Sequence, residues 1–325
     1  MNEFLHKTWD YLLVAGKATL IQLFVLLGPL LFLAFAMNFL ARKNEELSYK
    51  TLGQKVYLYV FGWLGTSVHE LGHAIFAILF THKISEIKLF TPTSGKSLGQ
   101  VKHSYTKGNP YQTVGNFFIG IGPILLGALL LWLVTWLLFD LNAISIAEKQ
   151  GVHINHRLFT SWELVKSTGQ GIFDGIVNIY RVVIENHGAY WWKVVLFIYL
   201  FYAIGSSVTL SSSDIKGAFR GFIYFVILLL VFNLATVWKG DFATRFFDKT
   251  GNYLSGFYFL IVLSMALNVV FIGILFLLRL IISPLNAKKP AKSKNYFSIF
   301  IKTSNLMTST DKFIIDIPKA ELHVH

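Results

Sequence analysis

The sequence predicts an all-α, multi-spanning membrane protein with about six transmembrane helices and a small cytosolic β-hairpin between the second and third. Three observations lead to this fold class, two on the composition and one on the spacing of the apolar residues. Of the 325 residues, 54% are hydrophobic and only 14% are charged, against roughly 25% charged residues in an ordinary soluble domain. The third observation is that the apolar residues gather in runs of about 20, the length that a membrane-spanning helix needs.

Six apolar runs have this length. The first, residues 18–40, contains no charged residue, and the second, residues 56–81, holds Glu70 as the only carboxylate that lies fully inside a predicted span. The other four runs are residues 113–139, 190–210, 219–238 and 254–278. We expect these runs and their connections to form one membrane-embedded domain, residues 1–285.

The polar segment between the second and third spans has the pattern of a β-hairpin. Residues 84–90 and 98–105 resemble short strands, and the segment between them is rich in Thr, Pro, Ser and Gly, which favour turns. The edge of such a hairpin could hold an unwound substrate by strand pairing; the alternative is a simple connector. In the long connection, residues 173–183 have apolar residues at helical spacing, which predicts either a helix on the membrane surface or an ordinary loop helix.

The net charge of +12 does not indicate a nucleic-acid partner, because Lys and Arg lie mostly in short segments between the apolar runs, where they orient membrane proteins. Their distribution favours a cytosolic N-terminus, hairpin, fourth-to-fifth connection and C-terminal tail. We therefore expect a multi-pass protein of a bacterial cytoplasmic membrane, with the N-terminus and the mouth of the active site facing the cytosol. The chain has no cysteine, which excludes disulfides and thiolate metal ligands.

The second span contains His69-Glu70-Leu71-Gly72-His73. Residues four apart lie on one face of a helix, so both imidazoles can reach one metal ion. A zinc ion held there would acidify a water molecule, and Glu70 could accept its proton as general base. Packing explains this cluster poorly, because an ionisable residue at membrane depth costs at least ~2.5 kcal/mol.

A catalytic zinc ion usually has three protein ligands, and Asp214 is the candidate for the third. It follows Ser211-Ser212-Ser213 at the end of the fourth span, on the side where the second span ends. The alternative is a solvated carboxylate at the membrane boundary. Because the histidines are expected to lie deeper than Asp214, a water-admitting cavity is needed, lined by the serines at positions 206, 207 and 211–213.

The two segments, His69-Glu70-Leu71-Gly72-His73 and Ser211-Ser212-Ser213-Asp214, resemble the site-2 protease family of intramembrane zinc metalloproteases, and the resemblance covers residues 56–220. In that family one span carries His-Glu-x-x-His and a later span supplies an aspartate. The resemblance implies Zn²⁺ with His69, His73 and Asp214 as ligands, Glu70 as the base, and cleavage of transmembrane segments of other proteins.

This sequence departs from the family's common pattern. The family's Asn-x-x-Pro-x-x-x-Leu-Asp-Gly is replaced by Ser-Ser-Ser-Asp214-Ile-Lys-Gly, which resembles a minor branch. The third span contains Gly120-Ile121-Gly122-Pro123. Its glycines predict close helix packing; the alternative function for this segment is Asn116 as a donor to the oxyanion.

The C-terminal part has a different composition. Residues 286–306 form a basic linker, and residues 307–325 end in a segment that resembles the opening strand of adenosine deaminases, whose His-x-His pair binds zinc. A period of two places His323 and His325 on one face of a strand, but the required barrel of about 250 residues does not follow. We expect a join between two reading frames or a chance match, and no folded domain.

The predicted function is therefore an intramembrane zinc metalloprotease that acts on transmembrane protein substrates in the lipid bilayer. One alternative is a non-catalytic membrane scaffold of the same fold, which the loss of Glu70 or of a metal ligand would indicate. A label of adenosine deaminase, taken from residues 307–325 alone, is the other alternative.

Overall fold

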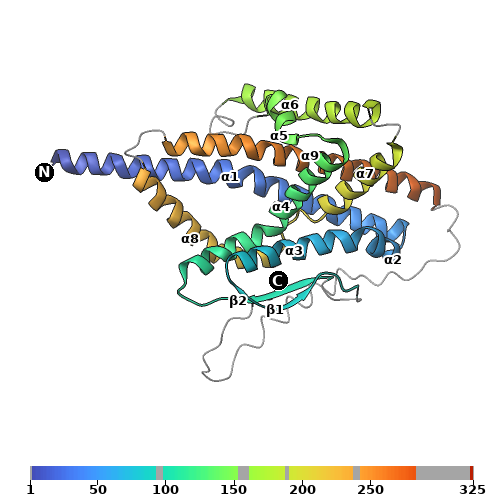
Figure 1. Cartoon of the computed structure of the whole chain (residues 1–325), viewed down its shortest axis with the longest axis horizontal. Coiled ribbons are helices and arrows are strands. Elements are labelled where there is room, and N and C mark those ends of the chain that lie inside the picture. Colours follow the sequence, from blue (N-terminus) through green and yellow to red (C-terminus); the bar gives the residue numbers. More distant parts are fainter. Residues whose placement is uncertain are drawn as a thin grey trace, which may run out of the picture.

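The computed structural model describes residues 2–92, 98–152, 161–186, 190–236, 242–282 and 323–324, and Figure 1 shows their arrangement. The fold class is confirmed, since helices form most of the described chain and one small antiparallel sheet lies at the side of the bundle, next to α3, residues Trp63–Leu79 (Figure 1). The elements, in chain order, are α1 (Asn2–Thr51), α2 (Gln54–Tyr57), the π-turn η1 (Leu58–Gly62), α3 (Trp63–Leu79), β1 (Lys83–Lys88), β2 (Gln100–Ser104), α4 (Pro110–Phe139), α5 (Ala143–Lys149), α6 (Trp162–Arg181), the π-turn η2 (Val182–Asn186), α7 (Trp191–Gly205), α8 (Ser212–Thr236), α9 (Phe242–Ile282) and β3 (His323–Val324).

Within the described residues, four helices are long and apolar enough to cross a membrane: α1, α4, α8 and α9. The predicted second span is also present, as α2, η1 and α3 in succession, with the π-turn dividing it. The predicted fourth span is only partly present, because α7 ends at Gly205 after 15 residues. At 1.5 Å per residue it is about 22 Å long, shorter than the roughly 30 Å hydrocarbon core.

The predicted reversal of direction between the fourth and fifth spans is wrong. Helices α7 and α8 contact α4 in one continuous order, so they run in the same direction along it. From the end of α4 to its start, the contacting pairs are Leu138 with Lys193, Gly127 with Val208, Gly120 with Ala218 and Phe117 with Gly221. Helices α7 and α8 therefore follow one another in the same direction along α4, with a break at residues 206–211. The N-terminus of α1 and the end of α9 lie at opposite ends of the bundle (Figure 1).

Helix α4 is the centre of the bundle. Buried apolar side chains on it join two clusters, one with α5, α7 and α9 around Leu131, the other with α1, α8 and α9 around Ile124. Its glycines allow close contact, as predicted: a Cβ at Gly122 would lie 2.6 Å from the Gly72 carbonyl oxygen of α3, and one at Gly120 would lie 2.6 Å from the Ala218 Cβ of α8.

Buried amide side chains fasten α1 to its neighbours. Gln22 and Asn233 of α8 exchange hydrogen bonds at 2.9 and 2.6 Å, and Asn44 donates to Asn268 of α9 at 2.8 Å. In a membrane interior such paired amides leave few polar groups unsatisfied, and here they fix the position of α1 against α8 and α9.

The predicted β-hairpin is confirmed, and it folds back along α3 instead of extending away from the helices. Strands β1 and β2 pair antiparallel, with Ile87 opposite Val101. The ring of Phe90, beyond β1, contacts Tyr59 at the start of the second span with centroids 6.1 Å apart. Inside a membrane, non-helical backbone is tolerated where protein covers it or where it lines a water-filled cavity. The hairpin packs on α3, and its residues Leu98 and Gly99 line a cavity.

The remaining predictions concern the long connection and the tail. Helix α6 contains most of the amphipathic segment, and it packs against the protein through small residues, with Gly175 against Phe259 of α9. The linker, 286–306, and residues 307–325 other than β3 lie outside the described residues. Strand β3 pairs antiparallel with β2.

Candidate metal centre

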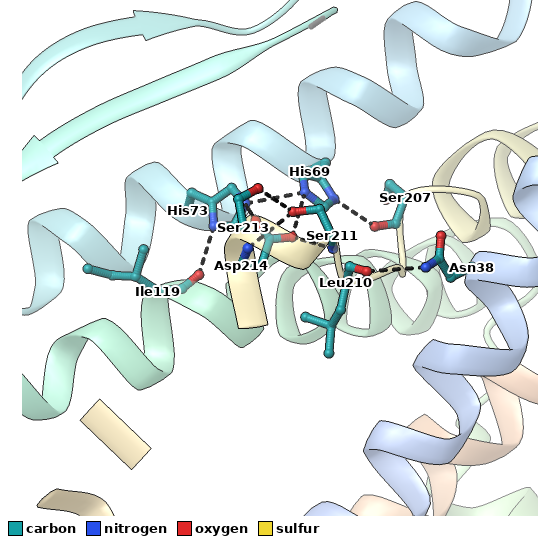
Figure 2. A network of polar contacts seen from close by, with 9 residues as sticks. All are labelled: Asn38, His69, His73, Ile119, Ser207, Leu210, Ser211, Ser213 and Asp214. Atoms are coloured by element: carbon teal, nitrogen blue, oxygen red, sulfur yellow. Dashed lines mark hydrogen bonds and ion pairs between the residues drawn. The ribbon is translucent and has the colours of Figure 1, made fainter. Parts of the chain in front are cut away.

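Three side chains from two elements converge beside the hairpin (Figure 2). His69 and His73 lie one turn apart on α3, and their Nε2 atoms are 3.2 Å from each other. Asp214, in the first turn of α8, places its carboxylate oxygens 3.5 Å from His69 Nε2 and 3.4 Å from His73 Nε2. One potential ligand atom of each residue therefore lies within 4.8 Å of the others.

The backbone fixes the orientation of both imidazole rings. His73 Nδ1 lies 2.8 Å from the Ile119 carbonyl oxygen of α4, and His69 Nδ1 lies 3.1 Å from the Ser207 carbonyl oxygen after α7. A carbonyl can only accept, so each Nδ1 carries the proton and each Nε2 keeps its lone pair for the centre of the site. Such contacts orient the histidine ligands of metal sites and fix their tautomer.

Asp214 is held by a capping box at the start of α8. The Ser211 hydroxyl accepts from the Asp214 N–H at 3.1 Å, and the Asp214 carboxylate accepts from the Ser211 N–H at 2.7 Å. This reciprocal pair is the one that a Ser-x-x-acidic segment forms at a helix start. Ser211 is thus a residue of the site that positions Asp214. The spacing of three residues between Ser211 and Asp214 in the sequence is sufficient to predict this capping box.

The depth difference expected between Asp214 and the histidines is absent. Because α7 ends early and α8 begins at Ser212, Asp214 lies at the break between the two helices, within 3.5 Å of His69 and His73. It is 1% exposed, which rules out a carboxylate solvated at the membrane boundary in this structure.

Glu70 borders a cavity of about 330 Å³ that also reaches His69. Its side chain is buried, and its Oε2 atom has no hydrogen-bond partner among the described residues. The cavity is lined largely by polar residues from α1, α3 and the α7–α8 connection, which include Asn38, Arg42, Glu45, Thr66, Ser206, Ser207 and Thr209. The predicted cavity is therefore present beside Ser206 and Ser207, whereas Ser211, Ser212 and Ser213 are not among its lining residues.

The residues fit a zinc ion. Two ligands at about 2.0–2.1 Å in tetrahedral geometry lie roughly 3.3 Å from each other, close to the 3.2, 3.4 and 3.5 Å measured between the three groups. Two imidazole nitrogens and a carboxylate are also a donor set that zinc accepts. Glu70, the neighbour of His69 in the chain, lines the same cavity as His69.

Asn116, the alternative oxyanion donor, is not among the residues that line this cavity. Its amide instead lies 3.4 Å from the Thr113 carbonyl oxygen of its own helix. The segment around it packs against Gly221 of α8, which favours the packing role.

The fold and the site together define a multi-pass membrane protein with a possible three-residue metal centre. The family model described as Peptidase M50B-like matches residues 36–147, which confirms the resemblance to the site-2 protease family and indicates a peptidase. The matched part includes α3 with His69, Glu70 and His73 and ends before Asp214. No curated protein and no solved structure matches the chain.

Proposed function

We propose that the protein is an intramembrane zinc metalloprotease that hydrolyses peptide bonds of transmembrane protein substrates. The observation that carries this proposal is the convergence of His69, His73 and Asp214, where His69 and its neighbour Glu70 line a cavity. A zinc ion bound to the three residues would supply Lewis-acid activation of a water molecule.

Each residue of the chain has a distinct role in this proposal. His69 and His73 bind through Nε2 because their Nδ1 atoms are engaged by backbone carbonyls. Asp214 contributes a negative charge that its capping box holds in place. Glu70 accepts a proton from the attacking water and returns it to the amine that leaves, a step for which a partnerless carboxylate oxygen is suited.

The substrate must be extended at the scissile bond, because a helix hides its carbonyl groups in hydrogen bonds. The hairpin lies beside the cavity, and the outer edge of β2 pairs with the two-residue strand β3. This pairing supports the view that the edge accepts another main chain. The lysines of the N-terminal segment and hairpin support a cytosolic N-terminus and hairpin, and we place the protein in a bacterial cytoplasmic membrane.

Two measurements on detergent-purified protein test this function. We expect about one zinc ion per chain in the wild type and its loss in His69→Ala. We also expect Glu70→Gln to retain zinc and to cleave a model transmembrane substrate about 10²- to 10⁴-fold more slowly, the usual contribution of a general base. Glu45→Gln is the matched control, since Glu45 lies in the same cavity away from the three potential ligands. Equal zinc in His69→Ala and wild type would exclude this centre. Zinc binding without cleavage would favour a non-catalytic scaffold.

A further inference from the structure

The segment that leads into β2 lies directly against the side chain of Glu70. Gly99 is buried and, with Leu98, lines the cavity that contains His69 and Glu70. A Cβ atom at position 99 would lie 2.5 Å from Glu70 Cγ and 2.9 Å from Glu70 Oε1. Carbon atoms do not approach so closely without displacement, so any other residue at this position would push the Glu70 side chain away.

A second contact restricts how this crowding could be relieved. The same Cβ would lie 2.9 Å from Thr66 Cγ2. Thr66 and Glu70 are one turn apart on α3, so the backbone of Gly99 lies between two side chains of the zinc helix. A larger residue would therefore have to move the hairpin, the glutamate or both.

The hairpin itself is held in place around Gly99. The Thr91 N–H donates to the Leu98 carbonyl oxygen at 2.6 Å, which extends the strand pairing beyond β1 and β2. Val101, two residues after Gly99, is fully buried, and Phe90 contacts the ring of Tyr59. Contacts on both strands thus fix where the backbone of Gly99 meets α3.

We propose that Gly99 is a positioning residue for Glu70, because its bare backbone forms the wall that keeps the carboxylate beside His69 and facing the cavity. The Oε2 atom has no hydrogen-bond partner among the described residues, so packing against Gly99 is a main restraint on this end of the side chain. This role depends on the proposed function, in which Glu70 is the general base, and it makes the hairpin a structural part of the catalytic site.

The kinetic test uses Gly99→Ala in full-length purified protein with a model transmembrane substrate. We expect kcat to fall about 10- to 100-fold, because displacement of a catalytic group by about 1 Å costs on this order. KM should stay within about twofold and the zinc content should not change. Gly16→Ala is the matched control, since it makes the same substitution in α1 where the added Cβ has no atom within 4 Å, and its kcat should equal that of the wild type. An unchanged kcat in Gly99→Ala, or a parallel loss of zinc, would overturn the proposal.

A crosslink tests the contact without any need for activity. The chain has no cysteine, so Thr66→Cys combined with Gly99→Cys introduces only one possible pair, and their side chains would be within disulfide reach. We expect mild oxidation in native membranes to join them, and to leave the pair Thr66→Cys with Ser85→Cys unjoined. Absence of the crosslink would overturn the proposed contact. An inactive wild type that still forms the crosslink would instead overturn the proposed function and, with it, the catalytic role of Gly99.

Discussion

The contact between α3 and α4 should not tolerate a side chain at position 72, within the His-Glu-Leu-Gly-His segment. In Gly72→Ala the new Cβ would lie 2.6 Å from both Cα and N of Pro123 and 2.7 Å from the carbonyl carbon of Gly122. All three atoms belong to the backbone, so no rotamer change relieves the overlap. Ordinary contact starts at 3.4 Å, and the two helices must separate to reach it.

The cost can be estimated against a matched glycine. Overpacking of this kind destabilises proteins by about 1–3 kcal/mol, while the change from Gly to Ala inside a helix gains up to about 1 kcal/mol. Gly16 of α1 has no atom within 4 Å of its added Cβ, so Gly16→Ala should show only the gain. The two variants should thus differ by about 1–3 kcal/mol, or roughly 2–6 °C in Tm for a chain of this size.

Thermal unfolding in detergent measures this difference, and zinc affinity gives a second result. Separation of the helices withdraws the Ile119 carbonyl from His73 Nδ1, now 2.8 Å away, and loss of such an orienting contact lowers metal affinity about 10- to 100-fold. If Gly72→Ala and Gly16→Ala shift Tm equally and bind zinc equally, the close contact between α3 and α4 is not what holds His73 in position.

Three further predictions address the other parts of the site. Asp214→Ala should weaken zinc binding at least 10-fold in competition with a chelator, because it removes one of three ligands; unchanged affinity would place the third ligand elsewhere. Val101→Pro removes a backbone donor from β2 and should sharply reduce cleavage at normal zinc content, with Tm measured as the check on folding because Val101 is buried; unchanged cleavage would mean that another element holds the substrate. Glu86 has its pKa lowered from 4.5 to about 2 by hydrogen bonds from Lys102 and Lys88, so its stabilisation of the hairpin is present above pH 4.5 and is lost as the pH falls to about 2. Hydrogen exchange should therefore show less protection of the hairpin in Glu86→Gln than in wild type at neutral pH, and no difference near pH 2; a difference that does not depend on pH would contradict this assignment.

Much of the protein follows from local sequence. The apolar runs identify membrane-spanning segments because the bilayer core accepts few polar groups, and the spacing of His69 and His73 places them on one helix face because α-helical geometry is fixed. The turn-rich segment between two short strands also predicts the hairpin correctly, since pairing between neighbouring strands is local. Ser211 and Asp214 had the spacing of a capping box, so their mutual hydrogen bonds were predictable as well.

The tertiary structure decided what depends on contacts between distant segments. The apolar run of residues 190–210 has the length of a complete span, yet α7 stops at Gly205 and α8 continues in the same direction along α4, where Gly127 contacts Val208 of the connection and Gly120 contacts Ala218 of α8. Hydropathy records the composition of a segment and contains no information on its direction, so it could not place Asp214 beside His73. The contact of Gly99 with Glu70 likewise depends on how the hairpin packs on α3. Glycine has no side chain and adds nothing to a hydropathy pattern, so the sequence alone does not connect it with Glu70, which lies 29 positions earlier.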